Sequence, residues 1–167
     1  MIFDKLKEGN MRYLRNSDPA LRIDTADNGQ HPYAVVICCS DSRVIPEEIF
    51  DASIGDLFVI RTAGNVLDKQ QFGSIEYAVE HLRCRQILML GHTGCGAIGA
   101  ALGGEESDGY ISSVTDYIRA NIGSEKDPYH ACRLNVEHGV NAIRRTVHDA
   151  DVAGAIYDIR SGAVEWL

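Results

Sequence analysis

Cysteine, histidine and a charged pair gather in two short segments of this 167-residue chain. The first is Cys39-Ser40-Asp41-Ser42-Arg43 and the second is His92-Thr93-Gly94-Cys95-Gly96. Cys39, His92 and Cys95 would together offer two thiolates and one imidazole, a soft ligand set that suits zinc in tetrahedral geometry with the fourth position open. A lone thiol is more often a small buried hydrophobe. The prediction of a metal site therefore depends on the conjunction of three ligand types with a neighbouring charged pair.

The charged pair is Asp41 and Arg43, which are two positions apart and can share one side of an extended segment. A carboxylate held by a guanidinium stays ionised and keeps its orientation. Beside a metal, it can accept a hydrogen bond from a bound hydroxide and direct that hydroxide at an electrophile. The alternative is that Asp41 or Ser42 caps a helix that starts near Pro46, and the two interpretations can coexist.

Both segments follow runs that are typical of strands buried on both faces of a parallel sheet. Residues 34–39 and 87–90 are continuous apolar runs, and residues 57–60 have the same character. Residues 72–82 show helical spacing between them, so strand and helix alternate and predict βαβ crossovers. Because ligands bind beyond the carboxyl ends of parallel strands, the two segments can converge on one point.

The rest of the chain supplies helices and an edge strand. We expect a helix over residues 2–15, a connecting loop over 16–32, a polar loop over 103–109, helices over 110–122 and 131–147, and a strand over 152–159 that returns through a turn as 163–167. Cys38 should point to the opposite face of its strand from Cys39 and pack in the core. The predicted fold is one α/β domain over residues 1–167, with a mainly parallel central sheet flanked by helices and an antiparallel C-terminal edge strand.

The glycines at 94, 96 and 99 match the G-x-G-x-x-G fingerprint of dinucleotide-binding proteins. That fingerprint normally opens a unit whose second strand ends in an acidic residue about 20 positions later. Here a polar loop and a helix follow instead of an apolar strand. The glycines more readily allow a helix N-terminus and its N–H groups to approach a metal-bound ligand closely.

Composition excludes several classes of partner. Sixteen Lys and Arg against 24 Asp and Glu give a net charge of −8, so the long-range field repels phosphate backbones and anionic lipid. No stretch reaches the roughly 20 apolar residues of a membrane span, and the start lacks the order of a signal peptide. Five cysteines, an odd number, fit reduced thiols better than a disulfide framework. We expect a cytoplasmic protein that binds neither nucleic acid nor membrane.

The motifs together resemble the β-class carbonic anhydrases. The resemblance lies in the two segments above and in Gly55-Asp56-Leu57-Phe58-Val59-Ile60-Arg61-Thr62-Ala63-Gly64-Asn65 between them. It extends through Ser74 to Ala78 and Gly154 to Ile159, and so covers nearly the whole chain from about residue 30. Their order and spacing agree with the family throughout.

This resemblance implies the site residues and the assembly. One Zn²⁺ per chain would be held by Cys39, His92 and Cys95, with Asp41 and Arg43 as the dyad that orients zinc-bound hydroxide. Gln30 would hydrogen-bond bicarbonate. The other substrate-binding residues would be Phe58, Ala63, Tyr77 and Gly96. The family also implies a homodimer or dimer of dimers, with a pocket at the subunit interface and the N-terminal helix packed on the neighbouring subunit.

The implied activity is that of a zinc lyase, a carbonic anhydrase (carbonate dehydratase) that reversibly hydrates carbon dioxide to bicarbonate and a proton. One alternative is a hydrolase of carbonyl sulfide or carbon disulfide on the same scaffold, since relatives use the same chemistry on these linear molecules. A second, of a different class, is a non-catalytic zinc- or dinucleotide-binding module. Val36 stands where members with a regulatory bicarbonate site carry tryptophan, so we expect no such site here.

Overall fold

The computed structural model describes residues 2–104 and 109–167, which form two compact units divided after Gln30. The first unit contains two helices, α1 (Ile2–Asn16) and α2 (Pro19–Asn28). The second unit, His31–Leu167, contains the sheet and the remaining helices. The helix expected over residues 2–15 is thereby confirmed, whereas the extent of a single domain over 1–167 stays a prediction.

Helix α2 replaces the connecting loop predicted over residues 16–32, and that prediction was wrong. Asp18 caps the helix by accepting a hydrogen bond from the Ala20 N–H at 2.8 Å, and Pro19 occupies the first turn. The helix ends at Gly29, whose φ is +80°. None of its residues is buried, so the segment carries no apolar stripe that a periodicity argument could detect.

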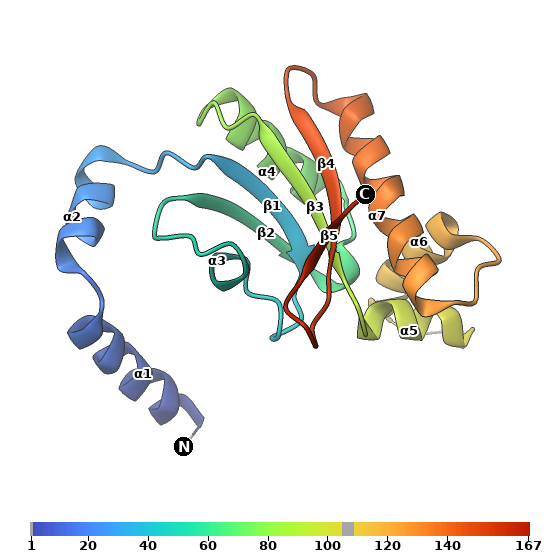
Figure 1. The fold of residues 1–167 in the computed structure, drawn as a ribbon, viewed down its shortest axis with the longest axis horizontal. Helices are drawn as coiled ribbons and strands as arrows, with labels where there is room; N and C mark the ends of the chain where they lie inside the picture. The colour runs from blue at the N-terminus through green and yellow to red at the C-terminus, as the bar shows by residue number, and fades with distance from the viewer. Residues whose placement is uncertain (1, 105–108) are drawn as a thin grey trace. The chain divides into compact units, whose positions relative to one another are not determined.

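A five-stranded sheet is the centre of the second unit, in the order β2-β1-β3-β4-β5 (Figure 1). The first four strands in this order are parallel, and β5 is antiparallel to β4. This arrangement confirms the mainly parallel sheet with an antiparallel C-terminal edge. The strands are β1 (Ala34–Cys39), β2 (Leu57–Thr62), β3 (Gln86–His92), β4 (Asp151–Tyr157) and β5 (Val164–Trp166).

Helices α4 (Lys69–Glu80) and α7 (Pro128–Thr146) cover one face of this sheet. Successive side chains of β1 point to opposite faces of the sheet. Ile37 packs against these helices, whereas Cys38 packs on the other face, beside the short helix α3 (Pro46–Ile49). The prediction that Cys38 belongs to the core on the opposite face is confirmed, because its side chain is fully buried there.

Both long helices start three residues before the predicted positions, and caps explain why. Asp68 and Gln71 form a capping box that begins α4 at Lys69. Asp127 accepts a hydrogen bond from the His130 N–H at 2.9 Å and begins α7 at Pro128. The apolar pattern marks only the part of each helix that faces the sheet.

Helices α5 (Gly96–Gly103) and α6 (Ile111–Ile122) and the 3-10 turn η1 (Ala63–Asn65) surround the carboxyl ends of β1 and β3. Residues 105–108 of the predicted polar loop lie outside the described residues, and Gly103 is the last residue of α5. Within residues 2–104 and 109–167, no helix is long and apolar enough to cross a membrane.

Gly91, the second-last residue of β3, lets α7 approach the sheet closely. A Cβ at this position would meet Val136 Cγ2 at 2.7 Å and Cys132 Sγ at 2.8 Å, distances that real Cβ atoms essentially never show. We expect Gly91→Ala to lower the free energy of unfolding by about 1–3 kcal/mol, because the added methyl overpacks the core. Urea unfolding followed by circular dichroism measures this.

Gly99→Ala is the matched control. Nothing lies within 4 Å of the Cβ it would add, and it sits inside α5. Alanine should therefore stabilise the protein by up to about 1 kcal/mol through helix propensity. A Gly91→Ala protein as stable as the parent would contradict the close approach of α7.

Candidate metal centre

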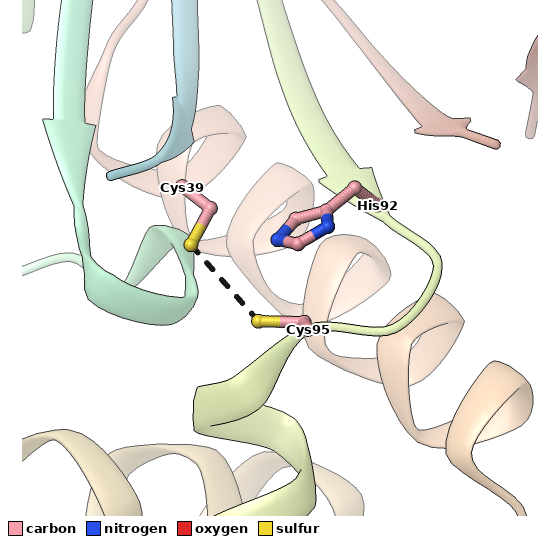
Figure 2. A group of neighbouring side chains, drawn as sticks. All are labelled: Cys39, His92 and Cys95. Atoms are coloured by element: carbon pink, nitrogen blue, oxygen red, sulfur yellow. Dashed lines mark hydrogen bonds between the residues drawn. The ribbon is translucent and has the colours of Figure 1, made fainter. Parts of the chain in front are cut away.

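Cys39, His92 and Cys95 come together at the carboxyl edge of the sheet (Figure 2). Cys39 is the last residue of β1, His92 is the last residue of the neighbouring parallel strand β3, and Cys95 is the N-cap of α5. One potential ligand atom from each lies within 4.8 Å of the other two, and the two sulfur atoms are 4.0 Å apart. The side chains point toward one another, as the sequence analysis expected from two adjacent strand ends.

The His92 imidazole is fixed in one orientation. Its Nδ1 lies 3.0 Å from the Thr93 carbonyl oxygen, which can only accept, so Nδ1 carries the proton and Nε2 presents its lone pair. The side chain is fully buried, and Nε2 has no hydrogen-bond partner within the described ranges. Leaving a buried polar atom unsatisfied costs about 1–3 kcal/mol. A cation between His92 and the two sulfurs would remove that cost.

The Cys39 and Cys95 thiols are hydrogen-bonded to each other. The Cys95 thiol lowers the pKa of Cys39 through their hydrogen bond, and the backbone N–H groups of Asp41 and Gly64, 3.4 and 3.3 Å from Cys39 Sγ, act in the same direction. The hydrogen bond with Cys39, together with burial, raises the pKa of Cys95. A cation bound between the sulfurs would displace the remaining proton.

The donor set fits zinc. Two sulfurs and one imidazole nitrogen, all buried, are the soft ligands that zinc takes in tetrahedral sites, and three protein ligands leave a fourth position for water or substrate. His92 Nε2, which has no partner among the described residues, and the two hydrogen-bonded sulfurs all belong to this cluster. A structural zinc site would normally be closed by a fourth protein ligand.

Asp41 and Arg43 form a bidentate ion pair beside this cluster. Arg43 Nε donates to Asp41 Oδ1 at 2.9 Å and Arg43 Nη2 donates to Asp41 Oδ2 at 2.7 Å. The guanidinium holds the pKa of the Asp41 carboxyl well below its usual range, so the carboxylate stays ionised. Asp41 Oδ2 is 3.9 Å from His92 Nε2, which places the carboxylate at the edge of the cluster.

A turn brings the pair together, where the sequence analysis expected an extended segment. Asp41 Oδ1 also accepts from the Arg43 backbone N–H at 3.0 Å, and the Val44 N–H donates to the Asp41 carbonyl. The alternative that Asp41 or Ser42 caps a helix is wrong, because α3 starts at Pro46 with Ile45 as its N-cap and no side-chain cap. Asp41 therefore caps no helix, and its carboxylate pairs with Arg43.

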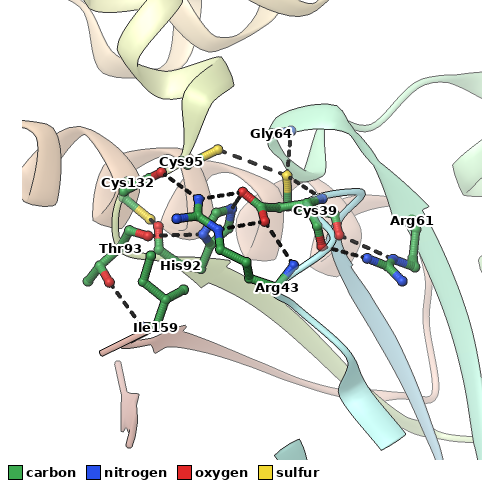
Figure 3. Close-up of polar contacts among 11 residues, drawn as sticks. Cys39, Arg43, Arg61, Gly64, His92, Thr93, Cys95, Cys132 and Ile159 are labelled. Atoms are coloured by element: carbon green, nitrogen blue, oxygen red, sulfur yellow. Dashed lines mark hydrogen bonds and ion pairs between the residues drawn. The ribbon is translucent and has the colours of Figure 1, made fainter. Parts of the chain in front are cut away.

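Two arginines hold the loop after β1 in place (Figure 3). Arg61, on β2, donates to the Asp41 carbonyl at 2.8 Å and to the Cys39 carbonyl at 3.3 Å. Arg43 Nη2 also donates to the Gly94 carbonyl at 3.2 Å, which joins the two segments that carry the ligands. The position of Asp41 relative to Cys95 is therefore set by main-chain contacts as well as by the ion pair.

The predicted substrate-binding residues are dispersed. Ala63 is the first residue of η1 and Gly96 the first of α5, so both adjoin the cluster. Phe58 pairs with Val35 in the sheet, four residues or roughly 13 Å along the strand from the level of Cys39. Its ring lies 6.1 Å from that of Tyr77, which is 47% exposed. The rings of Phe58 and Tyr77 therefore do not lie beside the Cys39-His92-Cys95 cluster of the same chain.

Gln30 is the last residue of the first unit, and its predicted role stays a prediction. A cavity of about 760 Å³ in the second unit lies at the opposite end of the strands, where Ala34, Leu57 and Ile87 contribute to its wall. Ligands of open parallel sheets bind at the carboxyl ends instead. Because of its location, we assign this cavity no part in the chemistry of the cluster.

The dinucleotide alternative finds no support in the topology. From Gly96 to Gly104 and from Gly109 to Asp149, the described residues form helices and loops, and the next strand is β4 at Asp151. The second strand with its acidic end that the fingerprint requires is absent from these ranges. Gly94 instead adopts φ +66° and presents its carbonyl to Arg43.

Several groups that support the ligands were missed by the sequence analysis. The Cys132 thiol donates to the His92 carbonyl at 3.4 Å, the Ile159 N–H donates to Thr93 Oγ1 at 3.2 Å, and Asn135 donates to the Gly64 carbonyl at 3.0 Å. Asn135 did leave a signal, because it is a polar residue on the buried, apolar stripe of α7. Each of the other two contacts involves a main-chain group, the His92 carbonyl or the Ile159 N–H, which sequence patterns do not mark.

Comparison with known proteins identifies the family. The family model described as "Carbonic anhydrase" matches residues 34–164. Carbonic anhydrase 2 of Mycobacterium tuberculosis is 44% identical over 70% of this chain, which spans 61% of that relative's length, and the carbonic anhydrase of Mycolicibacterium smegmatis is 41% identical over 96% of this chain and 89% of its own.

Solved structures agree with this assignment. A tetrameric β-carbonic anhydrase of Sordaria macrospora superposes with a TM-score of 0.80 at 28% identity and covers 99% of this chain and 94% of its own. The Coccomyxa β-carbonic anhydrase in complex with acetazolamide gives 0.83 at 26% identity, over 99% of this chain and 86% of its own. With the sheet order, the Cys-His-Cys cluster and the matched family model in agreement, the chain belongs to the β-carbonic anhydrase family.

Proposed function

We propose that this protein catalyses the zinc-dependent, reversible hydration of carbon dioxide to bicarbonate and a proton. The observation that carries the proposal is the buried Cys39-His92-Cys95 cluster, in which His92 Nε2 has no partner in the described part of the chain. An ionised carboxylate oriented by Arg43 lies at its edge. Family membership supports the same reaction.

The residues of the cluster would bind zinc through both sulfurs and His92 Nε2. Zinc in such a site lowers the pKa of a water ligand to about 7 and so supplies a nucleophile near neutral pH. Asp41 accepts the hydrogen bond of the attacking oxygen's proton, which leaves the oxygen lone pair directed at the carbon of carbon dioxide. Arg43 keeps that carboxylate ionised and aimed, since both of its oxygens are engaged by the guanidinium.

Substrate and product have different requirements. Carbon dioxide is apolar, and Ala63 at the edge of the cluster offers it a small apolar surface. Bicarbonate is an anion with hydrogen-bonding oxygens, for which we propose the Gln30 side-chain amide as donor. Phe58 lies on β2 away from the cluster, and the ring of Tyr77 on α4 lies beside it. We therefore propose that these two side chains line the pocket of a neighbouring subunit instead of their own.

A homodimer, or a dimer of dimers, would complete such pockets. Helix α1 exposes its large apolar side chains, and it has no buried residue. Exposed apolar surface of this kind marks interaction sites. We propose that the neighbouring subunit covers the face formed by Ile2, Phe3, Leu6, Tyr13 and Leu14.

Hydration is tested first by stopped flow near pH 8, with zinc per chain quantified on the same sample. We expect catalysis that scales with zinc content, is lost after chelation and returns when zinc is added, because hydration needs a water activated by the metal. If zinc-loaded protein does not accelerate hydration between pH 7 and 9, the proposal is wrong. Hydrolysis of carbonyl sulfide by the same sample would then identify the alternative substrate class.

Asp41→Ala separates orientation from metal binding. We expect the variant to keep one zinc per chain but to lose hydration activity by about 10–100-fold, because the attacking oxygen is no longer oriented. Cys95→Ala is the comparison and should lose zinc as well as activity, since it removes a ligand. An Asp41→Ala enzyme as active as the parent near neutral pH would contradict the role of the ion pair.

The assembly is tested by light scattering after gel filtration. The parent should elute with at least twice the monomer mass, and Phe3→Lys with Leu6→Lys should shift the mass toward the monomer, because charge then enters the apolar face of α1. Glu8→Lys places the same residue on the opposite face of the helix and should leave the mass unchanged. A parent that is already monomeric would refute the proposed dimer.

A further inference from the structure

Asn135 is a buried polar residue on a helix face that is otherwise apolar. It is 1% exposed and lies on the same stripe of α7 as Ala131, Val136 and Val140. Its Nδ2 donates to the Gly64 carbonyl at 3.0 Å, and its Oδ1 accepts from Asn121 Nδ2 on α6 at 2.9 Å. Because both ends of the amide are engaged, the side chain has one orientation.

Gly64 connects this amide to the metal centre. It adopts φ +62° in η1, a conformation that only glycine takes readily, and its N–H donates to Cys39 Sγ at 3.3 Å (Figure 3). A Cβ on Gly64 would meet Ile118 Cδ1 at 2.8 Å and Ala97 Cβ at 3.0 Å, so the turn has no room for a side chain. The turn is therefore held through its main chain, and Asn135 supplies a bond to it from the helix layer.

We propose that Asn135 is a positioning residue for the thiolate of Cys39, acting through the Gly64 main chain. The inference rests on the proposed function, because it concerns the same zinc ligand. An N–H group that donates to a ligating sulfur withdraws electron density that the sulfur would otherwise give to the metal. Holding Gly64 in place thus fixes both the position of the sulfur and its donor strength.

This role matters because the site has two thiolates. Each thiolate neutralises part of the metal charge and so weakens the metal as an electrophile. Cys39 Sγ accepts two backbone N–H groups, those of Asp41 and Gly64. The first is held by Arg61 through the Asp41 carbonyl and the second by Asn135 through the Gly64 carbonyl, so each donor has its own support.

A purely structural role would resemble that of Thr115. This side chain is also fully buried, on α6, but its hydroxyl donates only to carbonyls of its own helix, those of Ile111 and Ser112. Removing it affects the stability of the helix layer without a route to Cys39. Thr115→Val is therefore the matched control for Asn135→Leu, which removes the donor while retaining a side chain of similar size.

The test uses cobalt(II)-substituted protein, in which sulfur-to-metal charge-transfer absorption reports the electron density on the thiolates. For Asn135→Leu we expect the band to shift to longer wavelength, because the Cys39 sulfur loses a well-placed N–H donor. We also expect zinc to bind about tenfold more weakly in competition with a chelator, because a sulfur that is no longer held in place costs more affinity than its greater donor strength returns. Thr115→Val should leave the band and the affinity at parental values, and thermal melts of both variants measure stability separately.

An unshifted band in folded Asn135→Leu would overturn the proposal, and so would an equal shift in Thr115→Val. If Asn135→Leu does not fold, Asn135→Ala decides by the same criteria, because it also removes the donor to the Gly64 carbonyl and adds no bulk to the core. These readouts need no carbon dioxide. A parent that binds cobalt but does not hydrate carbon dioxide would refute the proposed function alone, and the spectra would still decide the role of Asn135.

Discussion

Burial of three side chains that could hold a metal, in otherwise apolar surroundings, is the constraint on which the site depends. Cys39 and Cys95 share their surroundings with Ile98, Ile118 and other aliphatic side chains, and His92 is fully buried. Polar atoms in such surroundings cost free energy unless they are paired. The main chain pairs most of them, through Thr93 for the imidazole and through two N–H groups for the Cys39 sulfur. The unpaired atom is the one that a metal would take.

The parallel sheet makes this burial achievable. Adjacent parallel strands end at the same edge, so a residue at the end of β1 and one at the end of β3 meet without any long excursion of the chain. The third ligand follows as the N-cap of α5, where the chain must turn in any case. Charged groups are confined to the rim, where Arg43 remains more than half exposed while it orients Asp41. The buried Cys39 and the partly solvent-exposed ion pair of Asp41 and Arg43 can thus be close neighbours in the sequence.

Sequence patterns predicted the strands of the sheet, because burial on both faces of a strand leaves a continuous apolar run. They also predicted the convergence of Cys39, His92 and Cys95, because adjacent parallel strands end at the same edge. They failed over residues 16–32, where α2 is held by the Asp18 cap and has no buried stripe. They also gave the wrong local geometry for Asp41, since a turn made by hydrogen bonds to its own side chain has no periodicity. What lay beyond their reach were contacts between side chains and distant main-chain atoms, such as those of Arg61 and Asn135.

Those distant contacts decide how the same three ligands behave. Two thiolates would make zinc a weaker electrophile than neutral imidazoles would, and activity near neutral pH requires that this be offset. Backbone N–H groups offset it only if they stay aimed at the sulfur. Arg61 reaches the Asp41 carbonyl from the edge strand β2, and Asn135 reaches the Gly64 carbonyl from helix α7. The helices that cover the sheet therefore contribute to the electronic character of the site as well as to the stability of the fold.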